Sequence, residues 1–325
     1  MAENEEKSLT VKESLARTCI LPESRPSTVY HYTSITGLRG ILSSGQLWAT
    51  NVKYLNDSSE YAYADRLVGE VFDDLKPSEL MRKILTIVTD NPQSRGFDVY
   101  TSCFCESGDL LSQWRAYAGH GTGYAIEFDW TILGEIVSKQ DYDLAGRVEY
   151  VETQQRDLIR SIVEQSLKPL IERDPVNVAL RELINAARAQ AGTEDIVRLV
   201  EMAAPNLQAG IEEIVLGPIL RTFSPLLVTR AFLKSPVFSE EREWRLVSAR
   251  HRKLRSHISF RASRDMLIPY TSWDLCADEG KLPVKRVVIG PSLHPNQARD
   301  SLALFLDGMN LGHIAISASE IPLRI

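Results

Sequence analysis

The chain has 325 residues, enough for one large domain or two ordinary ones, and its apolar fraction of 44% and charged fraction of 25% are those of a soluble globular protein. The formal net charge of -6 argues against a surface that binds nucleic acid over most of its area, although a local basic patch would be hidden in that sum. No apolar run is long enough to span a bilayer, and residues 1–10 lack the apolar stretch of a signal peptide, so we expect no membrane association.

The cysteine positions indicate which metal sites and which redox environment to expect. Cys19, Cys103, Cys105 and Cys276 do not fall into paired C-x-x-C spacings, so neither a structural zinc site nor any other metal site is predicted. Cys103 and Cys105 are expected to be small buried residues on one face of a strand. A reducing, cytoplasmic location fits this cysteine usage best.

The first predicted elements are a strand and a short helix. Residues 30–33 read as a strand that ends in a turn, and residues 35–42 carry apolar side chains at helical spacing. Gly45 stands where a helix C-terminus favours glycine. This order places His31 and Thr33 near the end of the strand, where a histidine is either a hydrogen-bonded structural residue or part of a site.

A second strand and a longer helix follow. Residues 47–50 are predicted to form the strand. Asp57, with Glu60 three residues later, resembles a capping box at the start of a helix that continues to about residue 75.

The middle of the chain combines a strand and an aromatic helix. Residues 99–105 are a predicted strand on which Ser102 points to one face and Cys103 to the other. Residues 110–117 are a predicted helix on which Trp114 and Tyr117, three apart, share a face. Such aromatic pairs are usually part of a core, but either ring could also stack on a ligand.

Residues 131–230 differ in pattern from the segments before and after them. A predicted strand over 124–129 ends where apolar residues begin to recur at spacings of three and four, as in long helices. We therefore expect a helical insertion over 131–230. It could form a lid, a partner surface or a dimer interface.

Charged and apolar residues alternate from residue 243 to residue 246, after the charged residues 241 and 242. If this segment is a strand, Glu241, Glu243 and Arg245 share one face, while Trp244 and Leu246 anchor the other face in a core. The charged row would then face a cleft or water. The arginine favours the ionised form of its carboxylate neighbours, although such pairs are as often structural as functional.

The last third of the chain returns to short strands. A basic run over 250–255 is either a solvated loop or a local patch for nucleic acid. Further strands are predicted at 258–261, 266–269, 284–289 and 314–317, with a helix at 296–306. The predicted fold is α+β: a split, mostly antiparallel sheet with flanking helices. A flexible segment over 1–20 precedes a core that consists of 21–130 and 231–325, with the helical insertion between these two parts.

Several segments together resemble a bacterial family catalogued as domain of unknown function 2971. They are Tyr30-His31-Tyr32-Thr33, Asn56-Asp57-x-x-Glu60, Ser102-Cys103-Phe104, Trp114-x-x-Tyr117 with Gly123 to Asp129, Glu241-x-Glu243-Trp244-Arg245-Leu246, and Val287-Val288-Ile289-Gly290. That family is in turn distantly similar to the ADP-ribosyltransferase superfamily. This second resemblance implies a split sheet and NAD as co-substrate.

The resemblance also implies roles for residues. His31, with Tyr32 and Thr33, would bind the adenosine-side ribose of NAD, and Ser102 would support the nicotinamide pocket. The stacking ring would be Tyr117 or Trp114. One of the pair Glu241 and Glu243 would be the catalytic carboxylate, and the other would position the acceptor. Glu243 is the first candidate for the catalytic role. Arg245 would line the same site.

Cleavage of the bond between nicotinamide and ribose expels a neutral leaving group, so one carboxylate that stabilises an oxocarbenium-like transition state can suffice. The expected activity is ADP-ribosyl transfer to a protein or nucleic-acid acceptor, as in a bacterial toxin or anti-phage effector with a cognate neutralising or sensor partner. The alternatives are an NAD glycohydrolase and a non-catalytic module that binds a nucleotide or a partner. Residues gathered around one cleft favour an enzyme, whereas Glu243 buried in a salt bridge with Arg245 favours the module.

Overall fold

The computed structural model describes residues 20–55, 58–75, 97–118, 122–139, 143–172, 225–251, 258–263, 265–276 and 281–322. The strands in this part of the chain are β1 (Thr28–Thr33), β2 (Gln46–Asn51), β3 (Phe97–Cys105), β4 (Tyr124–Asp129), β5 (Asp143–Arg147), β6 (Glu243–His251), β7 (Ser259–Ala262), β8 (Leu267–Asp274), β9 (Val284–Ile289) and β10 (Ala315–Ala318). The α-helices are α2 (Ile35–Ser44), α3 (Ser58–Asp74), α5 (Leu111–Tyr117), α6 (Trp130–Ser138), α7 (Glu152–Glu172) and α12 (Pro295–Gly308). Short 3-10 helices include η3 (Arg230–Phe232) and η4 (Pro236–Glu241).

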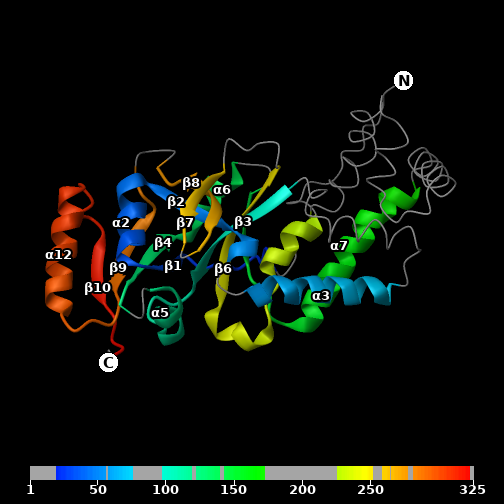
Figure 1. Ribbon diagram of the computed structural model, residues 1–325, viewed down its shortest axis with the longest axis horizontal. Helices are drawn as coiled ribbons and strands as arrows, with labels where there is room; N and C mark the ends of the chain where they lie inside the picture. Colours follow the sequence, from blue (N-terminus) through cyan, green and yellow to red (C-terminus); the bar gives the residue numbers. More distant parts are fainter. Residues whose placement is uncertain are drawn as a thin grey trace, which may run out of the picture.

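The described strands form one open sheet with the order β10-β9-β4-β1-β3-β2-β8-β7, in which β6 also pairs with β3, and β5 with β6. Every one of these strand pairs is antiparallel except β9 with β10. Figure 1 shows α12 and β10 at one end of the molecule and α3 and α7 at the other. The mixed, mostly antiparallel architecture confirms the α+β prediction at this level. No described helix has both the length and the hydropathy needed to cross a bilayer.

The sheet divides along one edge of β3. On its other edge, β3 pairs with β6 from Phe97 to Cys105. On the divided edge, β2 pairs at Tyr100 and Thr101, whereas β1 pairs at Cys105. Residues 102–104 of β3 therefore lie where β1 and β2 diverge, and we call this place the sheet opening.

Alternate side chains of the sheet belong to two cores. Phe104, Trp244 and Leu246 pack in a core with buried residues of α2, α6 and α12. On the opposite face, Val247 and Ala249 pack against α3 and α7, and Trp114 of α5 packs with β1 and β4. We call this second side the α5 face. The expected anchoring of β6 by its apolar residues is confirmed.

Several predicted elements are confirmed with close boundaries. They include α2, β3, α5, β4, β9 and α12. Gly45 ends α2 in the left-handed conformation, with φ of 65°, and its N–H donates to Ile41 O at 2.9 Å. The proposed cap of Asp57 and Glu60, residues 119–121, and most of the basic run lie outside the residues or side chains that the structure describes.

The range 131–230 is not wholly helical. Within it, α6 and α7 are helices, but β5 joins the sheet by pairing with β6. The five residues of β5 include no β-branched side chain, so they carried little strand signal. Gly146 permits the strand to pass close to Ile20 and Phe232, whose atoms a Cβ would meet at 2.8 Å and 3.0 Å. Residues 173–224 lie outside the described part of the chain.

Candidate functional site

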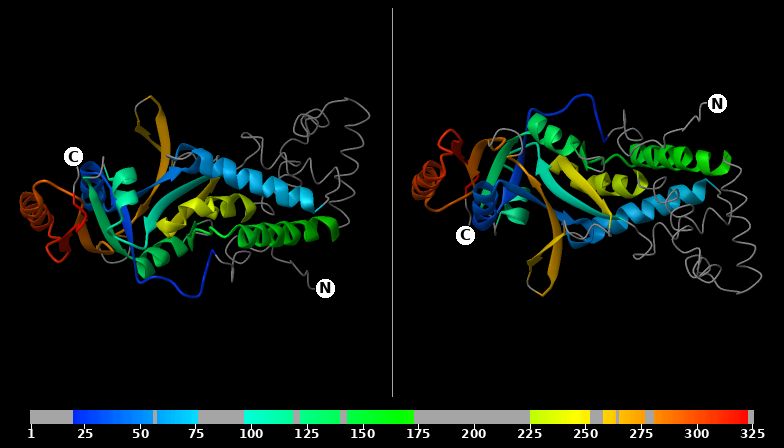
Figure 2. Two further views of the ribbon diagram at one scale, coloured as in Figure 1. Left: turned by 90° about the horizontal axis from the view of Figure 1, so that it is seen from below. Right: turned by 90° about the horizontal axis from the view of Figure 1, so that it is seen from above.

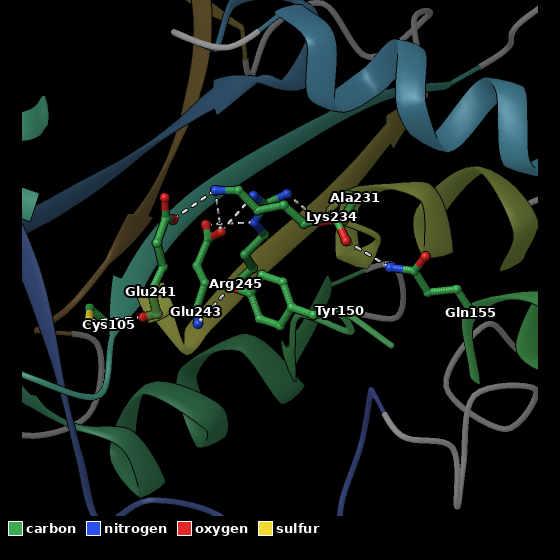
Figure 3. Close-up of polar contacts among 8 residues, drawn as sticks. All are labelled: Cys105, Tyr150, Gln155, Ala231, Lys234, Glu241, Glu243 and Arg245. Carbon is green, nitrogen blue, oxygen red and sulfur yellow. Dashed lines mark hydrogen bonds and ion pairs between the residues drawn. The ribbon is translucent and has the colours of Figure 1, made fainter. Parts of the chain in front are cut away.

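Four charged side chains meet at the start of β6, and we call them the charged cluster: Lys234, Glu241, Glu243 and Arg245 (Figure 3). Arg245 Nε lies 2.7 Å from Glu243 Oε1, and Arg245 Nη2 lies 2.8 Å from Glu243 Oε2. Lys234 Nζ lies 3.2 Å from Glu243 Oε2 and 2.7 Å from Glu241 Oε2. Two carboxylates are thus balanced by two cations.

The cluster is largely removed from water. The side chains of Lys234, Glu243 and Arg245 are 2%, 6% and 3% exposed, whereas that of Glu241 is 14% exposed. Buried charges are tolerated only when they are paired and hydrogen-bonded. The arrangement therefore has a strong structural function, and Glu241 is its member nearest to solvent.

Backbone and neutral side chains hold the cluster in place. Glu243 N donates to Tyr150 Oη at 3.1 Å, and Arg245 Nη1 donates to Ala231 O at 2.7 Å. Gln155 Nε2, on α7, donates to Lys234 O at 2.8 Å. The cluster thereby connects β6 to η3 and to the start of α7 (Figure 3).

Glu241 does not lie on the predicted strand, so the expectation that the strand pleat aligns it with Glu243 and Arg245 is wrong. It ends η4, and Arg242 follows with φ of 41°, in the left-handed region, before β6 begins at Glu243. The Cys105 thiol donates to Glu241 O at 3.0 Å. Glu241 meets Glu243 because Lys234 bridges their carboxylates, not because the pleat aligns them. The charged row is buried instead of facing water.

The electrostatics keep Glu243 ionised. Burial by itself raises the pKa of its carboxyl, but Arg245 and Lys234, with a hydrogen bond from Cys103, outweigh this effect and lower the pKa to about 2. Arg245, Lys234 and Cys103 together occupy the acceptor positions of the carboxylate. Glu243 is therefore a stable anion at neutral pH.

Cys103 and Tyr117 lie near Glu243, and both are more exposed than its carboxylate. The Cys103 side chain is only partly buried, and it lies opposite Arg245 in the β3–β6 register. Tyr117 is 38% exposed. Burial raises the pKa of the Tyr117 phenol. The nearby Cys103, Glu241 and Glu243 raise this pKa further, whereas Lys234 lowers it. Tyr117 thus belongs to the surroundings of the charged cluster.

His31 and Ser102 lie near the sheet opening, but their side chains are on the opposite face of the sheet from Glu243. His31 Nδ1 lies 2.9 Å from Cys103 O, and its ring contacts Phe104 with centroids 5.6 Å apart. Ser102 Oγ donates to Trp48 O. Because neighbouring residues on a strand face opposite sides, β3 separates these side chains from that of Glu243.

The state of the His31 ring follows from its bond. Burial lowers the pKa of the imidazole, so it is neutral at physiological pH. The carbonyl partner requires a proton on Nδ1, which leaves Nε2 as a hydrogen-bond acceptor.

The other residues expected to contact NAD have structural contacts. Trp114 is fully buried, packs edge to face on Tyr32 and donates from Nε1 to Asp109. Tyr32 Oη donates to Ser107 O and accepts from Leu110 N. Thr33 packs against Gly37, where a Cβ would overlap with Thr33 Oγ1. Trp114 and Tyr117 therefore do not share an environment, and Tyr117 is the ring near the charged cluster.

Lys234 and Tyr150 are site residues that the sequence did not indicate. Lys234 sits in an apolar stretch after η3, where a buried lysine is rare, and this is the one signal that could have identified it. Its position over the Phe238 ring, 5.0 Å from the centroid, adds a cation–π contact.

A family model matches the part of the chain that contains the charged cluster. Residues 113–246 match the model of a family described as "protein of unknown function (DUF2971)". The resemblance to this family is thereby confirmed for that range, which contains Tyr117 and the charged cluster but not His31 or Ser102. No curated protein and no solved structure matches the chain.

Proposed function

We propose that the protein consumes NAD and transfers ADP-ribose to a macromolecular acceptor, with the Glu243 carboxylate stabilising the transition state. The observation that carries the proposal is the ionised Glu243 at the start of β6, beside β3 and close to the sheet opening. Strands β1, β3 and β6, which carry His31, Ser102 and Glu243, are neighbours in the sheet. The ADP-ribosyltransferase resemblance assigns its site residues to these three strands.

Cys103 offers the route by which substrate reaches Glu243. Its thiol is the weakest of the donors on this carboxylate, because Arg245 and Lys234 donate with full charge. A ribose hydroxyl that replaced the thiol would gain a stronger hydrogen bond without breaking either ion pair. Partly exposed Cys103 and Tyr117 flank that approach, so the Tyr117 ring can stack on nicotinamide.

The chemistry then follows from the charges. The bond between ribose C1′ and nicotinamide breaks, its electron pair neutralises the pyridinium nitrogen, and the positive charge passes to the ribose ring. The Glu243 carboxylate stabilises this oxocarbenium character electrostatically. A lone pair of the acceptor forms the new bond to C1′, and Glu241, the more exposed carboxylate, takes the acceptor's proton.

One observation favours a second candidate, a non-catalytic module that binds a nucleotide or a partner. The Glu243 carboxylate is buried and fully hydrogen-bonded by its neighbours, as in a purely structural ion pair. His31 also lies on the other side of β3. In this alternative the charged cluster only shapes the surface around Tyr117.

Nicotinamide release and NAD binding separate the candidates. The purified protein is incubated with NAD, with and without cell lysate, and nicotinamide is measured by chromatography. Release that lysate accelerates supports transfer, and equal release without lysate supports a glycohydrolase. NAD binding by calorimetry without release under either condition supports the module and contradicts the enzyme.

A further inference from the structure

One aromatic pair is exposed on the arm of the sheet that β2, β8 and β7 form. Trp48 is 47% exposed, and its ring stacks on Tyr270 with centroids 4.3 Å apart and planes 27° from parallel. Figure 2 shows the β7–β8 hairpin projecting away from the body of the molecule. The other four tryptophans, Trp114, Trp130, Trp244 and Trp273, are at most 2% exposed. Trp48 is therefore the one tryptophan whose ring is half-exposed to solvent.

The backbone fixes Trp48 on the outside. Its neighbours on β2, Leu47 and Ala49, are 1% and 0% exposed and anchor the opposite face of the strand. Thr50 pairs with Tyr270 across β2 and β8, so the two aromatic rings are diagonal neighbours on the outer face. We call this stack the platform, and it presents the half-exposed Trp48 ring on the outer face of the sheet.

The platform lies on the α5 face. Thr50 lies directly opposite Thr101 of β3, and opposed residues of antiparallel strands share a face. Trp48 and Cys103, each two residues from this pair, therefore point to that same face as Glu243. A ligand seated on Trp48 lies across the sheet opening from the charged cluster.

A cation lies beside the platform. Arg261 of β7 places Nη2 3.5 Å from Thr50 Oγ1, which brings its guanidinium beside the stack. A positive charge at this position favours an anionic ligand.

We infer that the Trp48–Tyr270 stack binds an unpaired base of single-stranded nucleic acid, with Arg261 next to its phosphate. Exposed aromatic rings stack on unpaired bases of any sequence, and neighbouring cations follow the backbone. Duplex DNA or RNA does not offer a free base face to such a platform. The binding does not depend on the proposed function. If both hold, the bound strand is the acceptor of ADP-ribose.

Fluorescence anisotropy with a labelled 12-nucleotide single strand tests the inference on the full chain. We expect binding at low salt, preference over the corresponding duplex, and a roughly tenfold or greater loss for Trp48→Ala, as for one lost stacking contact. Trp48→Phe retains a ring and is expected to lose less, which separates stacking from misfolding. Arg261→Gln should reduce the slope of log K against log[salt] by about one, as expected for the loss of one phosphate contact.

Leu304→Ala provides the matched control, because Leu304 is 74% exposed on α12, which packs beside β10 at the opposite edge of the sheet from β7. Equal binding by Trp48→Ala and Leu304→Ala, or no preference for single strands, would overturn the inference. If NAD alone quenches Trp48 fluorescence and no oligonucleotide binds, the stack is part of the dinucleotide site instead. Binding without transfer of labelled ADP-ribose would support the inference and count against the proposed function.

Discussion

Arg245 folds back along its own strand and forms a two-pronged ion pair with Glu243, at 2.7 Å from Nε and 2.8 Å from Nη2. The two residues are neighbours on one face of β6, and both are almost completely buried. A buried charge pair repays its desolvation only when its hydrogen bonds are satisfied. Here Lys234 and Ala231 O complete the set, so the geometry around Glu243 is tightly determined.

Loss of Arg245 should be more harmful than loss of the whole pair. Arg245→Met leaves Glu243 buried with Lys234 as its remaining charged donor, and we expect it to lower the free energy of unfolding by about 3–5 kcal/mol. The double variant Glu243→Leu, Arg245→Met removes both charges and should recover part of that loss. Urea unfolding of Glu243→Leu, Arg245→Met and the double variant gives the coupling free energy between the two residues. Strictly additive losses would contradict the structural account of the pair.

Acid should destabilise the protein partly through Glu243. Its pKa in the folded protein is about 2, below the ordinary carboxyl value of 4.5, so the folded state binds its proton less readily than the unfolded state. This contribution is complete above about pH 4.5 and is lost as the pH falls toward 2. Urea unfolding at pH 6 and pH 3 should show a smaller loss of stability for Glu243→Gln than for wild type. An equal pH dependence would mean that the carboxylate is not held ionised.

Cys103 should become protected when NAD binds. In the proposed approach, a ribose hydroxyl takes the place of the Cys103 thiol on Glu243, so substrate covers this partly exposed side chain. Alkylation followed by mass spectrometry should show slower modification of Cys103 with NAD present. Cys276, which is also partly exposed, provides an internal control with unchanged modification. Equal rates at Cys103 with and without NAD would exclude this approach.

Tyr117 and Trp114 should respond differently to truncation. Tyr117→Ala should raise KM for NAD by about tenfold with little loss of stability, because the ring is partly exposed, while Tyr117→Phe should retain the stacking contact. Trp114→Ala should instead destabilise the fold by about 3–5 kcal/mol, as for a fully buried ring. Steady-state kinetics and thermal unfolding of the three variants check both statements. A structural role for Tyr117 would be indicated if Tyr117→Ala left KM unchanged.

Much of the sheet was predictable because its strands carry strong local patterns. The β-branched run of β9 and the alternation of Trp244 and Leu246 with charged residues both reflect burial on at least one side. β5 was missed because its five residues join the sheet through long-range pairing with β6 instead of through local propensity.

The candidate site was predictable only in part. Glu243, Arg245 and Tyr117 do come together, but Lys234 could not be paired with them from sequence, since η3 and η4 bring it there. The strand pattern also predicted that the charged row faces a cleft or water, because alternation alone does not reveal that η4, Tyr150 and α7 cover it. The separation of His31 from Glu243 depends on the β3 register, which the sequence does not encode locally.

Nicotinamide release from NAD by wild type, Glu243→Gln and Glu127→Gln tests the proposed catalytic role of Glu243 most directly. Glu127 is a buried carboxylate on β4, ion-paired with Arg286 and three strands from β6, or roughly 14 Å away. We expect release by wild type and Glu127→Gln, and a loss of at least about a hundredfold in Glu243→Gln with NAD binding retained. Release by Glu243→Gln at the wild-type rate, or by none of the three proteins, would contradict this role.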